Sequence, residues 1–462
     1  MFEKRCFMKI VIVGCGKIGR EVISNLVAEG HDVTVIDNNS AVISDITNVY
    51  DVIGLCGNGA DSDILTEAGI ESTELFAAFT GSDELNMLSC FIARRMGASH
   101  TISRIRNLEF NDRSLALLRQ HLNLSMAVNP EKLAAREIFN ILKFPSALKI
   151  ESFSARNFEM VEIRIKQDSP LHGMSLEHMR KKYSYKFLVC IVQRGDNVYI
   201  PDGNFELQSG DKVAITADPI EIQKLLKSLG ILKKQSKNVM IIGASRTAYY
   251  LSKMLLGIGC SVKVIDSNIN KCEEFSELLQ KVDVIHGDAA KEDLLEEEGL
   301  ESMDAFVSLT GMDEENILLS YFASNKNISK VIAKVNRADF VKMAENLGIE
   351  TTISPKYATT DIVVRYARAL ENSMGSSVET MYKLMDGKAE ALEFNVKSDC
   401  EILDVPLKNI NFKKNILIAG IIREKKTIII PAGDDIIKAG DKVVVLSAGS
   451  RINNLSDVIE WG

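Results

Sequence analysis

The sequence predicts an α/β protein in which parallel, doubly wound sheets are each followed by a small α+β domain. Three observations predict this class. A glycine-rich turn joins an apolar strand to a helix near the N-terminus, strands and helices then alternate up to about residue 142, and the same pattern begins again near Val239. Regular alternation of short apolar strands with helices is typical of parallel sheets.

The first strand and turn, which begin with Lys9–Val13, carry a nucleotide-binding pattern. Gly14, Gly16 and Gly19 fit G-x-G-x-x-G after this apolar strand, and Asp37 closes the next apolar run. The three glycines permit a tight turn, a close approach of backbone to pyrophosphate, and close packing of helix on sheet. The carboxylate stands at the distance from the turn at which it can accept hydrogen bonds from a ribose. The pattern predicts a nucleotide site, with a purely structural turn as the alternative.

Further elements complete the first sheet. A helix ending at Met96 follows the Thr80-Gly81 turn, and either Ser82 or Asp83 suits its N-cap. Pro130 suits the first turn of another helix, which reaches about Leu142. The other expected elements are strands at Val52–Cys56, Leu75–Phe79, Ile102–Ile105 and Met126–Val128, and a helix at Ser62–Ala68.

The pattern changes from about Ala147, where short strands separated by turn signals become frequent. This indicates a small α+β domain, and the polar run Lys233–Lys237 then reads as a linker. The elements expected in this domain are strands at Glu159–Ile165, Phe187–Gln193, Asn197–Ile200 and Lys212–Thr216, and a helix at Ser175–Lys182.

The second half of the chain repeats the first in nearly constant register. Gly14 corresponds to Gly243, and Arg104 corresponds to Lys334 with almost the same offset along the chain. The small domain repeats too, since Pro201 corresponds to Pro431 with the offset that relates Arg104 to Lys334. The sequence therefore predicts a tandem duplication with four domains, at residues 1–145, 146–232, 233–371 and 372–462.

Composition narrows the class of protein. The net charge of −8 argues against a broad nucleic-acid surface. No apolar run approaches the length of a membrane-spanning helix, and no apolar segment of a signal peptide follows the charged N-terminus. Eight cysteines without a C-x-x-C pair are typical of free thiols in a reducing compartment. We expect a cytoplasmic protein.

Two acidic pairs could be read as catalytic sites. Asp83-Glu84 and Asp313-Glu314 each follow a Thr-Gly turn. An N-cap with a first-turn acid, favoured by the helix dipole, is the preferred interpretation over a paired-carboxylate site. No histidine pair has the spacing of metal ligands, so we assign no catalytic and no metal-binding residue.

The motifs resemble a known family. GCGKIG, GNGAD, TGSDELN and ISRIR in order, followed by PLHGMSLEHM and GDKV, resemble the RCK family, regulators of potassium conductance. Two such units in one chain resemble the TrkA family of potassium uptake regulators. The resemblance implies a Rossmann-type domain in each unit and NAD(H) or ATP/ADP as ligands. It also implies a homotetramer bound to an integral-membrane potassium-conducting subunit of the Trk or Ktr type, at the inner face of the cell membrane.

The resemblance also implies binding residues in both units. Asp37 lies at the ribose, and a guanidinium at Arg104 can bind phosphate oxygens in a forked geometry. The remaining residues of the first unit are Gly14, Cys15, Gly16, Lys17, Ile18, Thr80 and Gly81. Those of the second unit are Gly243, Ala244, Ser245, Arg246, Thr247, Asp266, Thr310, Gly311 and Lys334.

The second unit departs from the pattern. Ser245 stands where the second glycine is expected, and Lys334 replaces a forked cation with a point charge. Weaker binding, another nucleotide or a structural role therefore all remain open there.

Two further alternatives concern function and assembly. The rival function is an NAD-dependent dehydrogenase, which needs an acid or base over the nicotinamide, and no such group stands out. A redox-sensing DNA-binding regulator lacks a helix-turn-helix pattern. The apolar helices Glu131–Leu142 and Lys356–Leu370 either form an assembly interface, as the resemblance implies, or cover their own sheets.

Overall fold

A computed structural model describes residues 8–460 except 111, 154–157, 232–234, 327, 374–377, 399, 424–426, 450–451 and 453. The chain forms two compact units. The first comprises Met1–Ile138, Asn238–Lys326 and Val331–Ala367, and the second comprises Phe139–Lys237, Asn327–Lys330 and Arg368–Gly462. The expected domain boundaries stay predictions, and part of the expected linker, residues 233–234, lies outside the described residues.

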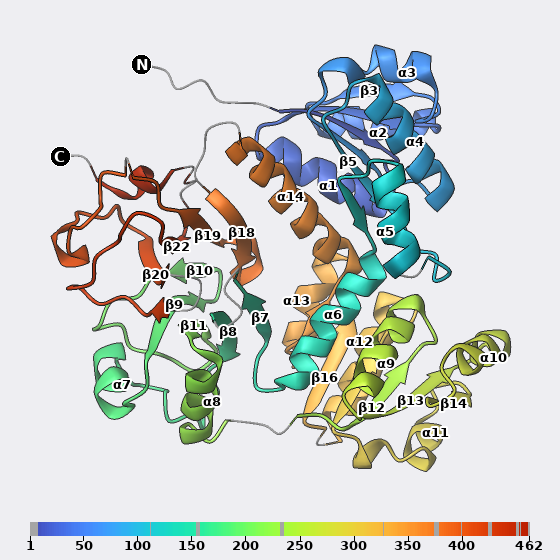
Figure 1. Cartoon of the computed structure of the whole chain (residues 1–462). Helices are drawn as coiled ribbons and strands as arrows, with labels where there is room; N and C mark the ends of the chain where they lie inside the picture. The colour runs from blue at the N-terminus through green and yellow to red at the C-terminus, as the bar shows by residue number, and fades with distance from the viewer. Residues whose placement is uncertain are drawn as a thin grey trace. The chain divides into compact units, whose positions relative to one another are not determined.

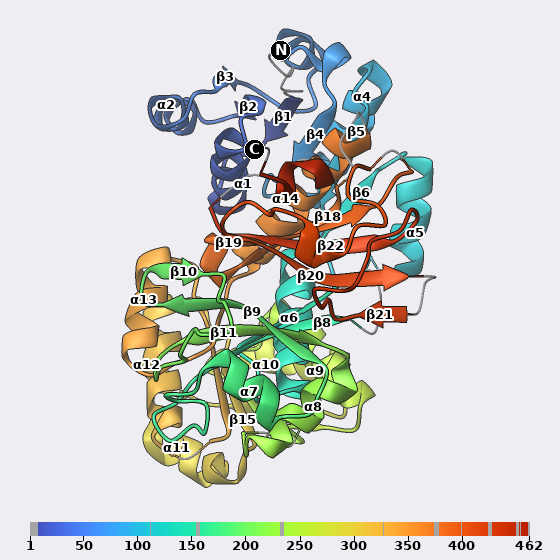
Figure 2. The same cartoon turned by 90° about the vertical axis from the view of Figure 1, so that its left-hand side faces the viewer.

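The first parallel sheet has the strand order β3-β2-β1-β4-β5-β6. Figure 1 labels its strands β3 and β5, and Figure 2 labels all of its strands. Its strand pairs are parallel, as the sequence predicts. The order reverses between β1 and β4, and ligands of such sheets bind at the carboxyl ends of the strands beside that reversal. The elements are β1 (Lys9–Val13), α1 (Lys17–Ala28), β2 (Asp32–Asp37), α2 (Ser40–Val49), β3 (Ile53–Cys56), α3 (Ser62–Glu67), β4 (Leu75–Ala78), α4 (Asp83–Met96), β5 (His100–Arg104), α5 (Asp112–His121), β6 (Met126–Val128) and α6 (Pro130–Lys143).

The second parallel sheet repeats this topology with the order β14-β13-β12-β15-β16-β17. The match of strand order in both halves agrees with the duplication seen in the sequence. Its elements are β12 (Asn238–Ile242), α9 (Arg246–Gly257), β13 (Ser261–Asp266), α10 (Ile269–Leu278), β14 (Asp283–His286), α11 (Glu292–Glu297), β15 (Ala305–Ser308), α12 (Asp313–Ser324), β16 (Lys330–Lys334), α13 (Ala338–Asn346), β17 (Thr352–Ile353) and α14 (Pro355–Ser373).

Local chemistry explains where several helices begin. Pro130 and Pro355 are the first residues of α6 and α14, where a missing N–H costs nothing. Ser82 caps α4, because its hydroxyl accepts a hydrogen bond from the Leu85 N–H at 3.1 Å. Of the two N-cap residues that the sequence left open, the structure therefore selects Ser82, and Asp83 has a different role.

Two small antiparallel sheets make up the core of the second unit. Their orders, β10-β9-β11-β8-β7 and β18-β19-β22-β20-β21, are equivalent when the strands are matched in chain order. The sequence prediction omitted β7 and α8. The elements are β7 (Lys149–Ser152), β8 (Glu159–Arg164), α7 (Leu176–Lys182), β9 (Phe187–Arg194), β10 (Asn197–Tyr199), β11 (Lys212–Ala217), α8 (Pro219–Ser228), β18 (Val378–Leu384), β19 (Ala389–Asn395), β20 (Ile416–Arg423), β21 (Thr427–Ile429) and β22 (Lys442–Ser447).

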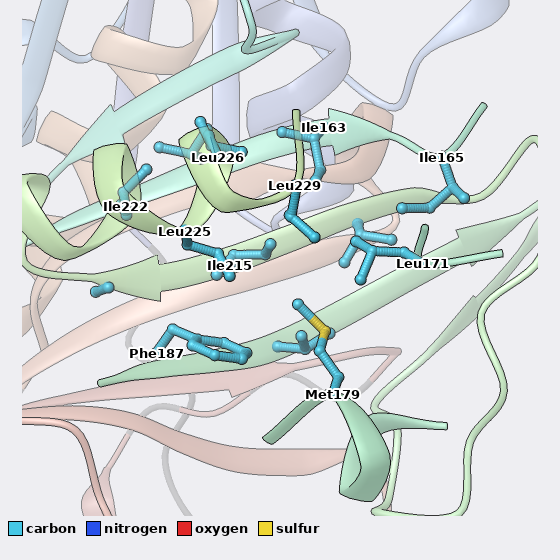
Figure 3. Close-up of a cluster of buried hydrophobic side chains, with 14 of the residues drawn as sticks. Ile163, Ile165, Leu171, Met179, Phe187, Ile215, Ile222, Leu225, Leu226 and Leu229 are labelled. Carbon is cyan, nitrogen blue, oxygen red and sulfur yellow. The ribbon is translucent and has the colours of Figure 1, made fainter. Parts of the chain in front are cut away.

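The first small sheet is buried on both faces. On one face, Ile163 and Ile215 pack against Leu225 of α8, within a cluster that also takes in Met179 of α7 (Figure 3). On the other face, Phe158 belongs to a second cluster that includes side chains of the last sheet. Burial on both faces explains why β9 and β11 read as nearly continuous apolar runs rather than as alternating ones.

Among the described residues, no helix is both long enough and apolar enough to span a membrane.

Candidate functional site

The glycine-rich loop after β1 has the geometry that its spacing predicts. Gly14 has φ +87°, and a Cβ there would lie 2.7 Å from the backbone nitrogen of Thr80, so only glycine fits. A Cβ at Gly19 would collide with the carbonyl oxygen of Gly14. Because glycine has no Cβ, α1 can pack closely on the loop. A Cβ at Gly16 would meet no atom within 4 Å. The start of α1 therefore faces open space.

Asp37 lies at the end of β2 beside this loop. One carboxylate oxygen accepts a hydrogen bond from the Cys15 N–H at 2.8 Å, and the other accepts one from Asn39 at 3.0 Å. These bonds fix the carboxylate where it borders the cavity at the end of the sheet. Its remaining acceptor capacity suits hydroxyl groups such as those of a ribose.

A cavity of about 630 Å³ opens at the carboxyl ends of the strands of the first sheet. It brings together six of the predicted residues, Gly14, Gly16, Asp37, Thr80, Gly81 and Arg104. Sequence reasoning assigned no binding role to several other lining residues, among them Asn38, Asn58, Ser82, Leu85 and Arg106. Arg106 lies two residues after Arg104 in the ISRIR motif. This spacing could have predicted that Arg106 also lines the cavity.

The three other predicted residues of this half do not line the cavity. The Cys15 side chain is buried, and burial raises the pKa of its thiol to about 12, so the loop uses its N–H rather than its sulfur. Lys17 and Ile18 instead border a neighbouring cleft of about 970 Å³ in the same unit, which Arg246 and Thr247 also border.

Arg104 is the main cation of the first cavity. It is 7% exposed and donates through Nη2 to the carbonyl oxygen of Thr80. Burial and the adjacent Arg106 lower the pKa of Arg104 to about 10, so it remains charged at neutral pH. Its Nε has no hydrogen-bond partner within the described part of the chain. A buried guanidinium with spare donors suits an anionic group such as a phosphate.

The first turn of α4 holds the loops around Arg104. Asn86 is fully buried, and its Oδ1 accepts hydrogen bonds from the N–H and hydroxyl of Thr80 at 2.8 and 2.7 Å. Asp83 accepts hydrogen bonds from the N–H groups of Arg106 and Asn107, both at 2.7 Å. We call Asp83 and Asn86 the α4 clamp. The sequence interpretation of Asp83 as an N-cap or first-turn acid was incomplete, because its partners follow the next strand rather than lying in its own helix.

The second half repeats the clamp. Asn316 accepts from the Thr310 N–H at 2.8 Å and donates to the Lys334 carbonyl oxygen at 2.9 Å. Asp313 accepts hydrogen bonds from the N–H groups of Asn336 and Arg337 at 2.8 and 2.9 Å. Asp83 and Asp313 therefore both bind backbone, which accounts for their burial without a paired-carboxylate site.

The second cavity, at the carboxyl ends of the second sheet, is smaller, at about 270 Å³. The predicted residues that line it are Gly243, Ser245, Asp266, Thr310, Gly311 and Lys334. Ala244 contributes its N–H, which donates to Asp266 at 2.8 Å. Arg246 and Thr247 do not line it and border the neighbouring cleft instead. Other lining residues that the sequence left unassigned include Ser267, Lys271, Asp288 and Glu315.

Lys334 takes the place of Arg104 in the second cavity. Its ammonium donates to the Leu309 carbonyl oxygen at 3.4 Å, and burial lowers its pKa below the ordinary value of 10.5. Asp313 and Glu131 oppose this shift. The second cavity therefore has a point charge where the first has a forked guanidinium.

Comparison with known proteins identifies the family. The TrkA-N domain model matches residues 10–130 and 239–355, and the TrkA-C domain model matches residues 160–230 and 391–459. The chain is 30% identical to "Trk system potassium uptake protein TrkA homolog 1" of Methanosarcina mazei, over 97% of this chain and 99% of that protein. It is 27% identical to "Trk system potassium uptake protein TrkA" of Halomonas elongata, over 96% of each chain.

A solved structure shares the fold. The GsuK channel bound to NAD superposes with a TM-score of 0.62 at 15% identity, over 97% of this chain and 78% of that one. The expected fold, parallel doubly wound sheets each followed by a small α+β domain, is thus confirmed. With both domain models matched twice, in alternation and in the predicted order, the chain belongs to the TrkA family of Trk system potassium uptake proteins.

Proposed function

We propose that this chain is the nucleotide-binding regulatory subunit of a potassium uptake system. NAD(H) or ATP/ADP binds on the first parallel sheet and alters the activity of an integral-membrane potassium-conducting subunit of the Trk or Ktr type. The chain works as two copies of a two-domain unit. The first copy comprises the domains at residues 1–145 and 146–232, and the second comprises those at residues 233–371 and 372–462. A homotetramer of the chain is held at the inner face of the cell membrane by that partner.

The observation that carries this proposal is the first cavity. It combines an open helix start at Gly16, a carboxylate at Asp37 and a buried guanidinium at Arg104 around one space of about 630 Å³. Free N–H groups at a helix start and a guanidinium suit phosphates, and a carboxylate after the second strand suits a ribose. Family membership and the NAD bound in the GsuK channel support the same ligand class.

The energetics are feasible. Moving a two-state gate from 1:99 to 99:1 needs about 5.5 kcal/mol of differential binding. Shared over the first parallel sheets of the four chains in a tetramer, this is about 1.4 kcal/mol per site, comparable to what a single hydrogen bond to a charged group contributes.

The test is a flux assay with a defined partner. The membrane subunit from the same organism is co-purified with this chain and reconstituted in liposomes, and potassium uptake is measured with no nucleotide, ATP, ADP, NAD and NADH. We expect the chain to co-purify and at least one nucleotide to change uptake only when the chain is present. Failure to co-purify, or uptake that no nucleotide changes, would contradict the proposal.

A further inference from the structure

The second cavity differs from the first in the start of its helix, in the charge of its lining and in its volume, and each difference disfavours a pyrophosphate. We propose that the second cavity is a nucleoside site, which takes a nucleoside with at most one phosphate and excludes the pyrophosphate of dinucleotides and of nucleoside di- and triphosphates. This inference rests on the proposed function, because it takes the first cavity as the nucleotide site against which the second is compared.

The ribose end of the site is retained. Asp266 accepts hydrogen bonds from the Ala244 and Asn268 N–H groups, both at 2.8 Å, as Asp37 does from Cys15 and Asn39. Gly243 keeps the left-handed conformation of Gly14, with φ +98°. The part of the second cavity that would hold a sugar therefore has the same construction as in the first.

The phosphate end is altered at the start of the helix. The Ser245 hydroxyl accepts a hydrogen bond from the Ala248 N–H at 3.3 Å and caps α9. The Ser245 N–H donates to the Gly243 carbonyl oxygen at 2.9 Å. At the corresponding position of the first half, Gly16 has no side chain, and a Cβ would enter open space. N–H groups that could bind a phosphate are thus used within the protein, and a side chain occupies the approach.

The charge of the lining has also changed sign. The first cavity is lined by Arg104 and Arg106 against Asp37. The charged residues that line the second are Lys271 and Lys334 against Asp266, Asp288 and Glu315.

Two of these acids replace uncharged residues of the first cavity. Glu315 stands at the position of Leu85, and Asp288 at that of Asn58, with the same offset that relates Lys334 to Arg104. Burial lowers the pKa of Lys334 and of Arg104 alike, so the two added acids rather than the cations distinguish the second cavity. A pyrophosphate, with its own negative charges, is disfavoured in such surroundings.

The volume of the second cavity also favours a small ligand. Ligand cavities in proteins usually measure about 300–1,000 Å³. The second cavity, at about 270 Å³, lies just below this range and has less than half the volume of the first. A nucleoside suits this space better than a dinucleotide does.

The test uses the full-length chain, stripped of nucleotide, with the first cavity disabled by Asp37→Ala. Isothermal titration calorimetry is performed with adenosine, guanosine, cytidine and uridine, and then with the monophosphate, the diphosphate and NAD. We expect one nucleoside to bind with a stoichiometry of one per chain, its monophosphate to bind within about tenfold of it, and its diphosphate and NAD to bind at least about tenfold more weakly.

Exchanged variants supply the control. Adding Ser245→Gly, Asp288→Asn and Glu315→Leu to the Asp37→Ala chain should raise the affinity for the diphosphate, relative to the affinity for the nucleoside, at least about tenfold. The opposite exchange, Gly16→Ser with Leu85→Glu in an Asp266→Ala chain, should weaken diphosphate binding at the first cavity. Melting temperatures confirm that each variant folds.

Three results would overturn the inference. These are diphosphate or NAD binding as tight as the nucleoside in the Asp37→Ala chain, no binding by any nucleoside, and exchanged variants that leave diphosphate affinity unchanged. Failure of the proposed function is distinguishable, because it shows as an absence of ADP, ATP and NAD binding to the Asp266→Ala chain, whose first cavity is intact.

Discussion

The side-chain amide of Asn86 donates a hydrogen bond to the carbonyl oxygen of Arg104 at 3.0 Å, while its oxygen accepts the N–H of Thr80. One fully buried side chain thus joins the ends of β4 and β5, the two strands that carry Thr80 and Arg104 to the first cavity. The position of the arginine is therefore set by α4 as well as by its own strand.

Replacing Asn86 by leucine should harm both stability and binding. Several buried polar groups lose their partner, so we expect the free energy of unfolding to fall by about 2–3 kcal/mol. ADP binding at the first cavity should weaken about tenfold. Urea denaturation and calorimetry measure the two effects. The matched control is Asn316→Leu, which should cost similar stability and leave the first cavity unchanged. Equal losses of ADP affinity in both variants would contradict a positioning role.

Arg104→Ala should remove discrimination among nucleotides while the fold persists. A hydrogen bond to a charged group contributes about 1.5–3 kcal/mol, so phosphate-rich ligands should bind about 10- to 100-fold more weakly. Calorimetry with ATP, ADP and NADH measures this, and Arg104→Lys tests whether the fork or only the charge matters. Unchanged affinities for all three ligands would remove Arg104 from the binding site.

Gly420→Ala should destabilise the second unit. A Cβ at this position of β20 would collide with the Phe158 ring, lying 2.9 Å from two of its other carbons, and that ring is fully buried. Overpacking of this kind costs about 1–3 kcal/mol. The double variant Gly420→Ala with Phe158→Leu should recover part of the loss in the midpoint of urea unfolding. Additive losses in the double variant would show that the two residues do not contact each other.

Lys334 should make stability depend on pH. Its folded-state pKa lies below the ordinary value of 10.5 because of burial, so the unfolded chain binds the extra proton more readily. The free energy of unfolding should therefore rise with pH between the folded-state pKa of Lys334 and its ordinary value. This gain in stability should be lost as the pH falls through the same range. Lys334→Met should flatten this rise. Urea unfolding of both proteins across this range measures it, and parallel curves would contradict the assignment.

Much of the site could be predicted from local sequence. Gly14 and Asp37 belong to a pattern whose partners lie close together along the chain, and Pro130 marks its helix start by its own covalent structure. The role of Asp83 could not be predicted, because it binds the backbone of Arg106, which only the sheet brings near.

α8 could have been predicted as well, because Asp218 caps it and Pro219 is its first residue. β7 has one apolar residue, Ile150, so its pairing with β8 rather than its own sequence defines it.

The difference between the two cavities was only partly visible in the sequence. Ser245 and Lys334 departed from the motif and could be noticed directly. Glu315 and Asp288 became significant only once the structure placed them in the lining, because neither belongs to the glycine-rich pattern. Equivalent folds can therefore differ in ligand class through residues that no motif includes.

The most direct test of the account compares potassium uptake by the reconstituted membrane subunit with the wild-type chain, Asp37→Ala and Asp266→Ala, each with and without ADP, ATP and NADH. We predict that nucleotide-dependent uptake is lost in Asp37→Ala and that di- and triphosphates still act on Asp266→Ala. Nucleotide-dependent uptake that persists unchanged in Asp37→Ala would contradict the central claim that the first cavity is the regulatory nucleotide site.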